Sequence, residues 1–139
     1  MPVVYLTRRE RFSSAHRLFN PDLSDEQNLQ IFGQCSHPNW HGHNYELFVT
    51  VKGEVNADLG YAVNAKDISR IVHDMVVLKL DHKNINMDVD FMRGKMASTE
   101  NLAVSIWNEL QKPLAVVGAL LHCIRIVETE NNSVEYYGE

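Results

Sequence analysis

The stretch from Cys35 to Asn44 contains side chains that can bind a metal or carry a proton. It places the thiol of Cys35 a short loop before the triplet His41-Gly42-His43. The triplet opens an alternating run of apolar and polar residues that predicts a β-strand, so His41 and His43 share one face. Zinc accepts neutral imidazole, and a catalytic zinc usually takes three protein ligands and keeps an open position. The two histidines therefore supply part of a metal site, and a third ligand is needed.

A third imidazole is available at the end of the preceding predicted strand, residues 3–16. If this strand pairs antiparallel with the strand that starts at His41, its last residue lies beside the start of the second strand. We therefore predict that His16, His41 and His43 bind one ion. Two strand histidines can also form a polar edge without any metal, and the triplet alone leaves that alternative open.

The two cysteines, Cys35 and Cys123, lie in contrasting surroundings. In a reducing compartment we expect both to be free thiols. Cys123 lies in the apolar segment Leu120–Ile124 and is predicted to fill the core, whereas Cys35 lies in a polar loop that contains a proline. Packing gives no reason for a thiol in that loop, so Cys35 is a candidate reactive group.

The length and composition predict one soluble domain, residues 1–139, large enough to bury a core without disulfides. The chain is 45% apolar and 22% charged, and no apolar run approaches the length of a membrane span. Its first residues lack the pattern of a signal peptide, so we expect a cytoplasmic protein. The formal charge of −5 argues against nucleic acid as a partner, because that needs a basic surface.

The residues between the first two strands predict a helical insertion. Ser24 and Gln27 have the spacing of a capping box, and Gly33 suits the end of a helix. We expect this insertion to present Cys35 over the metal. Long loops in compact domains are often functional.

The remaining elements complete the order strand, strand, helix, helix, strand, strand. After the strand that begins at His41 come a helix from the cap Asn64 to about Lys79, a helix from the cap Thr99 to Pro113, and a hairpin of residues 120–129 and 133–137. This ββααββ order predicts an α+β fold, with a four-stranded antiparallel sheet and two helices on one face. The other face then needs a partner, so we expect an oligomer.

Five separated motifs occur in order along the chain: Phe12-Ser13-Ser14-Ala15-His16, Cys35 with His41-Gly42-His43-Asn44-Tyr45, Leu80-Asp81-His82-Lys83-Asn84, Ser98-Thr99-Glu100-Asn101, and Val127-Glu128-Thr129. Together they resemble the 6-pyruvoyltetrahydropterin synthase family over nearly the whole chain. The resemblance implies the tunnelling fold, in which trimers close a β-barrel and two trimers stack into a homohexamer. It also implies a zinc-dependent lyase of tetrahydrobiopterin biosynthesis that converts 7,8-dihydroneopterin triphosphate to 6-pyruvoyltetrahydropterin and triphosphate.

The resemblance also implies a role for particular residues. It assigns zinc to the three histidines named above, proton abstraction to Cys35, a proton relay to Asp81 and His82, and the anchoring of the pterin ring to Glu128. Neighbours on an extended segment point opposite ways, so a direct contact between Asp81 and His82 needs a bent backbone. Thr99 and Glu100 are explained by helix capping, and a contact with the pterin is an added possibility.

Two residues depart from the family pattern. Trp40 stands before His-Gly-His where the family commonly has glycine, and His37 lies next to the thiol loop, where it could compete for the metal or perturb Cys35. Three alternative functions stay open. They are 6-carboxytetrahydropterin synthase activity, in which the cysteine lies closer to the His-Gly-His triplet, a structural zinc module with Cys35 as fourth ligand, and a generic zinc hydrolase.

Overall fold

The computed structural model describes residues 2–139 of this chain. The strands are β1 (Val3–His16), β2 (His41–Glu54), β3 (Lys83–Asn84), β4 (Leu120–Thr129) and β5 (Asn132–Tyr136). The helices are α1 (Asp25–Phe32), α2 (Ala65–Val72), α3 (Leu78–Leu80), α4 (Ile85–Asp88) and α5 (Thr99–Val116). A π-helical turn, His73–Val77, joins α2 to α3, and Gly33–Ser36 and Asp90–Met92 form 3₁₀ turns.

The sheet has five strands in the order β3-β1-β2-β4-β5. The α+β class is as expected, but the predicted four-stranded antiparallel sheet is incomplete, because β3 adds a short parallel strand beside β1 at Ser14 and Ala15. The other neighbours pair antiparallel. The two residues of β3 are Lys83 and Asn84, a pair too short and too polar to give a strand pattern. Only the tertiary pairing with β1 defines this strand.

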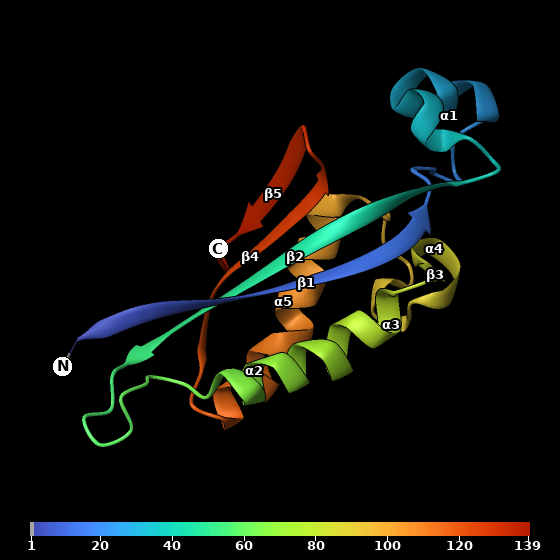
Figure 1. Ribbon diagram of the computed structural model, residues 1–139. Helices are drawn as coiled ribbons and strands as arrows, with labels where there is room; N and C mark the ends of the chain where they lie inside the picture. Colours follow the sequence, from blue (N-terminus) through green and yellow to red (C-terminus); the bar gives the residue numbers. More distant parts are fainter. Residues whose placement is uncertain (1) are drawn as a thin grey trace.

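One face of the sheet forms the core together with the long helices. Along β2, Tyr45, Leu47 and Val49 are at most 1% exposed, while the residues between them are partly exposed. α2 contacts α5, and both contribute fully buried side chains such as Ile68 and Leu102 to the same core. Figure 1 shows both helices alongside the sheet. This arrangement agrees with two helices on one face. Within residues 2–139, no helix combines the length and the apolar character needed to cross a bilayer.

The ends of α5 differ from the prediction. Ser98, rather than Thr99, caps the helix, since its side chain accepts a hydrogen bond from the Asn101 N–H at 3.1 Å. Pro113 was expected to end the helix, but the helix continues to Val116. A proline here removes a hydrogen bond only near the end of the helix, and the following Leu114 is completely buried. The packing of Leu114 outweighs the local cost of the proline.

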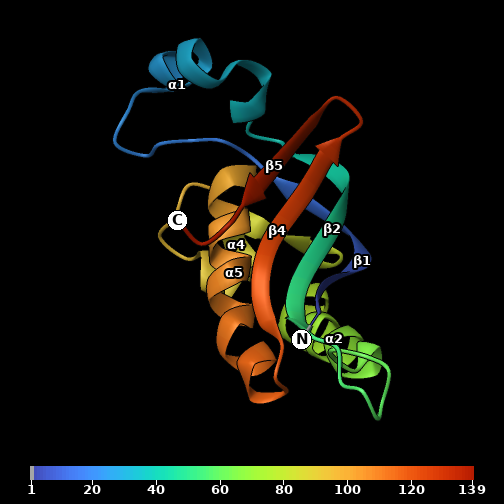
Figure 2. The same ribbon diagram turned by 90° about the vertical axis from the view of Figure 1, so that its left-hand side faces the viewer.

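The insertion between β1 and β2 folds as the sequence predicts. The Ser24 hydroxyl accepts a hydrogen bond from the Gln27 N–H, and the Gln27 side chain accepts one from the Ser24 N–H. Gly33 ends α1 with φ of 58°, a left-handed conformation that glycine adopts without strain. In both views, α1 stands apart from the sheet at the end where β1 finishes and β2 begins (Figures 1 and 2).

Candidate metal centre

Strand pairing brings three imidazoles together at this end of the sheet. β1 and β2 pair antiparallel with His16 opposite His41 and Ser14 opposite His43, as the sequence predicts. One ring nitrogen from each histidine can be chosen so that all three lie within 4.8 Å of one another. The ring centroids are 4.5 Å apart for His16 and His41, and 4.9 Å apart for His41 and His43. These separations suit three ligands of a single ion.

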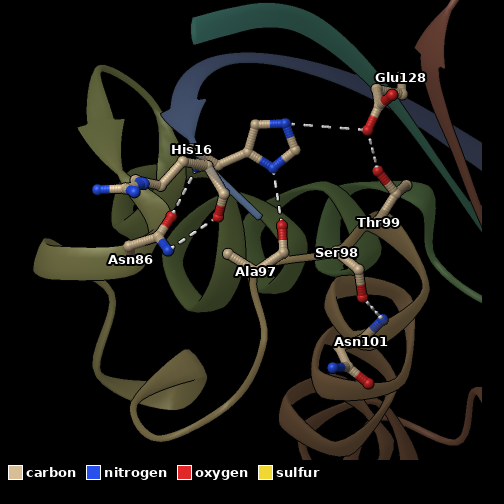
Figure 3. Close-up of polar contacts among 8 residues, drawn as sticks. His16, Asn86, Ala97, Ser98, Thr99, Asn101 and Glu128 are labelled. Carbon is tan, nitrogen blue, oxygen red and sulfur yellow. Dashed lines mark hydrogen bonds and ion pairs between the residues drawn. The ribbon is translucent and has the colours of Figure 1, made fainter. Parts of the chain in front are cut away.

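Hydrogen bonding leaves ring nitrogens free to bind that ion. His16 is 2% exposed, and its Nδ1 lies 2.7 Å from the carbonyl oxygen of Ala97 (Figure 3). Because a carbonyl only accepts, Nδ1 carries the proton, and the lone pair of His16 is on Nε2. This Nε2 is buried and has no hydrogen-bond partner, and the same is true of Nδ1 in His41. Unpartnered buried atoms are rare in folded proteins, so they favour a ligand here.

The protonation of the histidines also suits a metal. Burial lowers the pKa of His16 below its usual value, and the hydrogen bond to Ala97 opposes this only in part. Burial lowers the pKa of His41 too, and the neighbouring charge of protonated His16 adds to the effect. Both imidazoles are therefore held in the neutral form, which is the form that binds metal ions.

Glu128 lies beside the histidines and is fixed by Thr99. One carboxylate oxygen, Oε2, accepts a hydrogen bond from the Thr99 hydroxyl and lies 4.0 Å from His16 Nε2 (Figure 3). Because Ser98 caps α5, the hydroxyl of Thr99 is free to make this contact. The pairing of β4 with β5 is irregular between Val127 and Thr129, and such bulges often lie next to active sites. Glu100 is exposed in the first turn of α5.

Cys35 comes near this end of the molecule without joining the ligand group. It is exposed in the 3₁₀ turn after α1. Its carbonyl oxygen accepts a hydrogen bond from the Leu18 N–H at 2.8 Å, which ties the turn to the chain just beyond His16. The group of potential ligands within residues 2–139 contains His16 and its two partners but no thiol. This geometry does not support Cys35 as the fourth ligand of a closed site.

Asp81 and His82 form a pair through the bent backbone that such neighbours require. His82 has φ of 59°, and its Nδ1 lies 2.9 Å from Asp81 Oδ2. Asp81 Oδ1 accepts a hydrogen bond from the Ser13 N–H at 2.8 Å, and the His82 N–H donates to the Ser13 oxygen at 2.7 Å. The hydrogen bond from Ser13 is the main reason why the pKa of Asp81 is lowered, with His82 adding to it.

The Asp81–His82 pair does not lie with the three histidines of its own chain. It adjoins Ser13, whose side chain bonds Asn44 on the sheet face opposite to the buried Ser14. The His82 side chain is 84% exposed. The pair therefore lies outside the candidate metal-binding group.

The two departures from the family pattern lie outside the ligand group. His37 is exposed, and its Nδ1 accepts a hydrogen bond from the Asn39 N–H. Trp40 adopts φ of 67°, a left-handed conformation that favours glycine. This geometry explains why a glycine fits the position before His-Gly-His. Arg17 was not among the predicted site residues. It follows His16 directly and contacts the Trp40 ring, and its place next to a candidate metal ligand was the available signal.

These features define an α+β protein with a three-histidine group that could hold a metal ion next to a fixed carboxylate. Residues 5–139 match the family described as 6-pyruvoyl tetrahydropterin synthase, and the chain belongs to this family. It is 45% identical over 134 residues to 6-pyruvoyl tetrahydrobiopterin synthase of Homo sapiens, covering 96% of this chain and 91% of the relative. The corresponding protein of Dictyostelium discoideum is 46% identical over 136 residues, with 98% and 97% covered. The structure of Caenorhabditis elegans 6-pyruvoyl tetrahydropterin synthase superposes with a TM-score of 0.92 at 33% identity, covering 100% of this chain and 98% of that one.

Proposed function

We propose that this chain converts 7,8-dihydroneopterin triphosphate to 6-pyruvoyltetrahydropterin with release of triphosphate, a lyase reaction of tetrahydrobiopterin biosynthesis. The observation that carries the proposal is the convergence of three imidazoles beside the Glu128–Thr99 pair in a chain of this family. In this proposal, residues 1–139 form a single domain and the protein is cytoplasmic.

The metal in this proposal is zinc, bound by His16, His41 and His43. The unpartnered Nε2 of His16 and Nδ1 of His41 support the assignment, since neutral imidazole nitrogen is a good zinc ligand. Zinc with an open position supplies Lewis acidity, which stabilises negative charge that develops on the side-chain oxygens of a substrate.

Glu128 anchors the pterin ring. Its carboxylate has one oxygen held by Thr99 and stays close to the metal ligands. A pterin presents an amino group and a ring N–H side by side, and one carboxylate can accept both. Thr99 positions the acceptor, and Glu100, at the exposed start of α5, is a further proposed contact of the substrate.

Cys35 takes protons from the side-chain carbons of the substrate. It is exposed on a turn tied to the residues just after His16, and a thiolate is a competent base. Asp81 and His82 relay protons. With Nδ1–H held by Asp81, the Nε2 of His82 is the atom that exchanges a proton with the site.

Assembly into a homohexamer, a dimer of trimers, completes the site. The Asp81–His82 pair lies outside the histidine group of its own chain, and in this proposal it serves the metal site of a neighbouring subunit. The outer edge of β1 supports assembly with other chains. β3 pairs with this edge only at Ser14 and Ala15, so the rest of the edge is available to a strand of another chain. A monodisperse monomer by light scattering would contradict the assembly.

The reaction is tested by incubating the purified protein with dihydroneopterin triphosphate and identifying the products by mass. We expect 6-pyruvoyltetrahydropterin and triphosphate. A carboxytetrahydropterin product, or simple hydrolysis of the phosphate ester, overturns the proposal in favour of the sister synthase or a zinc hydrolase. Full zinc content without any turnover favours a structural zinc module.

A further inference from the structure

The guanidinium of Arg17 lies over two aromatic rings next to the proposed metal ligands. Its Cζ lies 4.0 Å from the centre of the Phe19 ring and 5.5 Å from the centre of the Trp40 ring. Arg17 follows His16, and Trp40 precedes His41, which lies opposite His16 in the sheet. Ring contacts of this kind orient a guanidinium without using its N–H donors. The donors of Arg17 therefore stay available for a ligand.

Arg17 has a charge that no carboxylate neutralises within residues 2–139. Its Nε is buried and lacks a hydrogen-bond partner, and none of the ion pairs in this part of the chain includes it. By contrast, Arg125 lies 5.1 Å above the Phe48 ring and also pairs with Glu135 at 3.7 Å. A buried charged donor without a partner is costly, so the environment of Arg17 favours an anionic ligand.

The backbone of Arg17 is held in place by Asn86 of α4. The Arg17 N–H donates to Asn86 Oδ1, and Asn86 Nδ2 donates to the Arg17 carbonyl oxygen, both at 3.0 Å. Figure 3 shows Asn86 and Glu128 on opposite sides of the His16 side chain. The carboxylate, the metal ligand and the segment around Arg17 thus follow one another across the site.

We propose that Arg17 binds the triphosphate of the substrate, an inference that rests on the proposed function. In dihydroneopterin triphosphate the pterin ring, the hydroxylated side chain and the triphosphate follow one another. This order matches Glu128, the metal ligands and Arg17. A guanidinium binds phosphate oxygens with two parallel N–H bonds, and the flanking rings keep its plane fixed for that contact.

A cavity next to Arg17 has room for phosphate groups. It has a volume of about 380 Å³ and is also lined by Ser36 and His37. His37 accepts a hydrogen bond from the Asn39 N–H at Nδ1, so its neutral ring carries the proton on Nε2 and can donate it to a phosphate oxygen. His37, which departs from the family pattern, is thus a second hydrogen-bond donor beside Arg17.

The test is calorimetric titration of the purified, metal-containing protein with inorganic tripolyphosphate. We expect Arg17→Gln to weaken binding at least tenfold and Arg17→Lys, which keeps the charge without the fork, to weaken it less. Arg125→Gln is the matched control, because it removes a ring-stacked arginine that has a carboxylate partner, and it should leave the affinity unchanged. Equal affinities for wild type and Arg17→Gln overturn the inference.

Further measurements separate binding from folding and from chemistry. The metal content and melting temperature of each variant exclude metal loss or unfolding as the cause of weak binding. If Arg17→Gln does not fold, Arg17→Lys decides the matter through KM, which should rise for the triphosphate substrate while kcat changes little; an unchanged KM overturns the inference. Binding of tripolyphosphate that depends on Arg17, without the pyruvoyl product, supports this inference and refutes the proposed function. The pyruvoyl product together with binding that is independent of Arg17 does the reverse.

Discussion

Asn28 and His16 are both polar and almost completely buried, at 1% and 2% exposure, yet their hydrogen bonding differs. Asn28, in α1, donates to the carbonyl oxygens of Asn20 and Ser24, both at 3.0 Å, and accepts from the Asn20 N–H at 2.7 Å. His16 bonds Ala97 through Nδ1 and leaves Nε2 without a partner. A fully bonded buried amide holds a loop together, whereas a half-bonded imidazole is ready for a ligand.

The other unpartnered atoms extend this comparison from single residues to regions. In the part of the chain that the structure describes, the buried side-chain atoms without a partner are His16 Nε2, Arg17 Nε, His41 Nδ1 and Tyr45 Oη. All of them lie on or beside the paired ends of β1 and β2. None comes from α1, although α1 and its turn bury Asn28 and Ser36. The paired ends of β1 and β2, here called the sheet end, therefore have polar atoms free to bind a ligand. The polar groups buried in the insertion instead stabilise the insertion itself.

Removing a ligand from the sheet end should have the largest effect. We expect His41→Ala to weaken metal binding by at least about a hundredfold. Changing a residue that only hydrogen-bonds to a metal ligand already lowers metal affinity about 10–100-fold. Metal analysis of the purified variant measures this. His73→Ala is the control, since His73 is exposed in the turn between α2 and α3 and should keep its metal. Full occupancy in His41→Ala contradicts a site built on the strand pairing.

Cys35 tests whether the insertion contributes chemistry as well as structure. Cys35→Ala should lower turnover by about a hundredfold, the usual range for losing an acid–base group, while metal content and melting temperature stay near wild type. The exposed thiol and its position outside the ligand group lead to this expectation. Loss of metal together with a lower melting temperature would instead make Cys35 a structural ligand.

The sequence predicts the sheet end well because its signals are local and regular. The alternation along β1 and β2 determines which side chains share a face, so the approach of His16 to His41 follows from antiparallel pairing. The capping box of α1 is equally local. β3 cannot be predicted from the sequence, because its two polar residues form a strand only through pairing with β1.

The parts of the site that the sequence does not predict depend on contacts between distant residues. Ala97 orients His16 through a carbonyl oxygen, which every residue type has, so no sequence pattern marks it. The stacking of Arg17 on Trp40 requires a left-handed backbone at Trp40, and no propensity predicts that for tryptophan. The contact between Asp81 and His82 likewise depends on an unusual backbone angle.

Asn28 provides the opposite test, a change that should affect stability and spare the metal. Asn28→Ala leaves the Asn20 N–H without its partner and removes one of the two hydrogen bonds that the carbonyl oxygens of Asn20 and Ser24 each accept, which costs about 1–3 kcal/mol of unfolding free energy. Thermal unfolding should show a melting temperature lowered by several degrees. Metal content should equal that of wild type. A clear loss of metal would show that the two regions are coupled.

The pH dependence of the metal-free protein gives a smaller effect. The pKa of His16 and His41 is lowered from 6.5 by burial in the folded protein, so the unfolded chain binds more protons just below pH 6.5. Stability should therefore fall as the pH decreases through this range and level off below the folded-state pKa values. Urea unfolding at pH 7.5 and 5.5 measures this. His41→Ala should show a shallower dependence, and an identical slope would contradict the assignment.

Trp40 offers the smallest and most local test of how the sheet end is shaped. Its φ of 67° costs a residue with a Cβ about 1–2 kcal/mol, which glycine avoids. Trp40→Ala and Trp40→Gly both remove the ring above Arg17, so they differ mainly in this backbone cost. After the greater unfolded-state freedom of glycine is subtracted, we expect Trp40→Gly to be more stable than Trp40→Ala by up to about 1 kcal/mol, seen as a higher melting temperature. Both variants should hold Arg17 less firmly and bind tripolyphosphate more weakly than wild type, because one flanking ring is missing. If the alanine variant is the more stable of the two, the backbone at residue 40 relaxes when the ring is removed. The left-handed conformation before His41 is then imposed by the tryptophan side chain and not by the metal site.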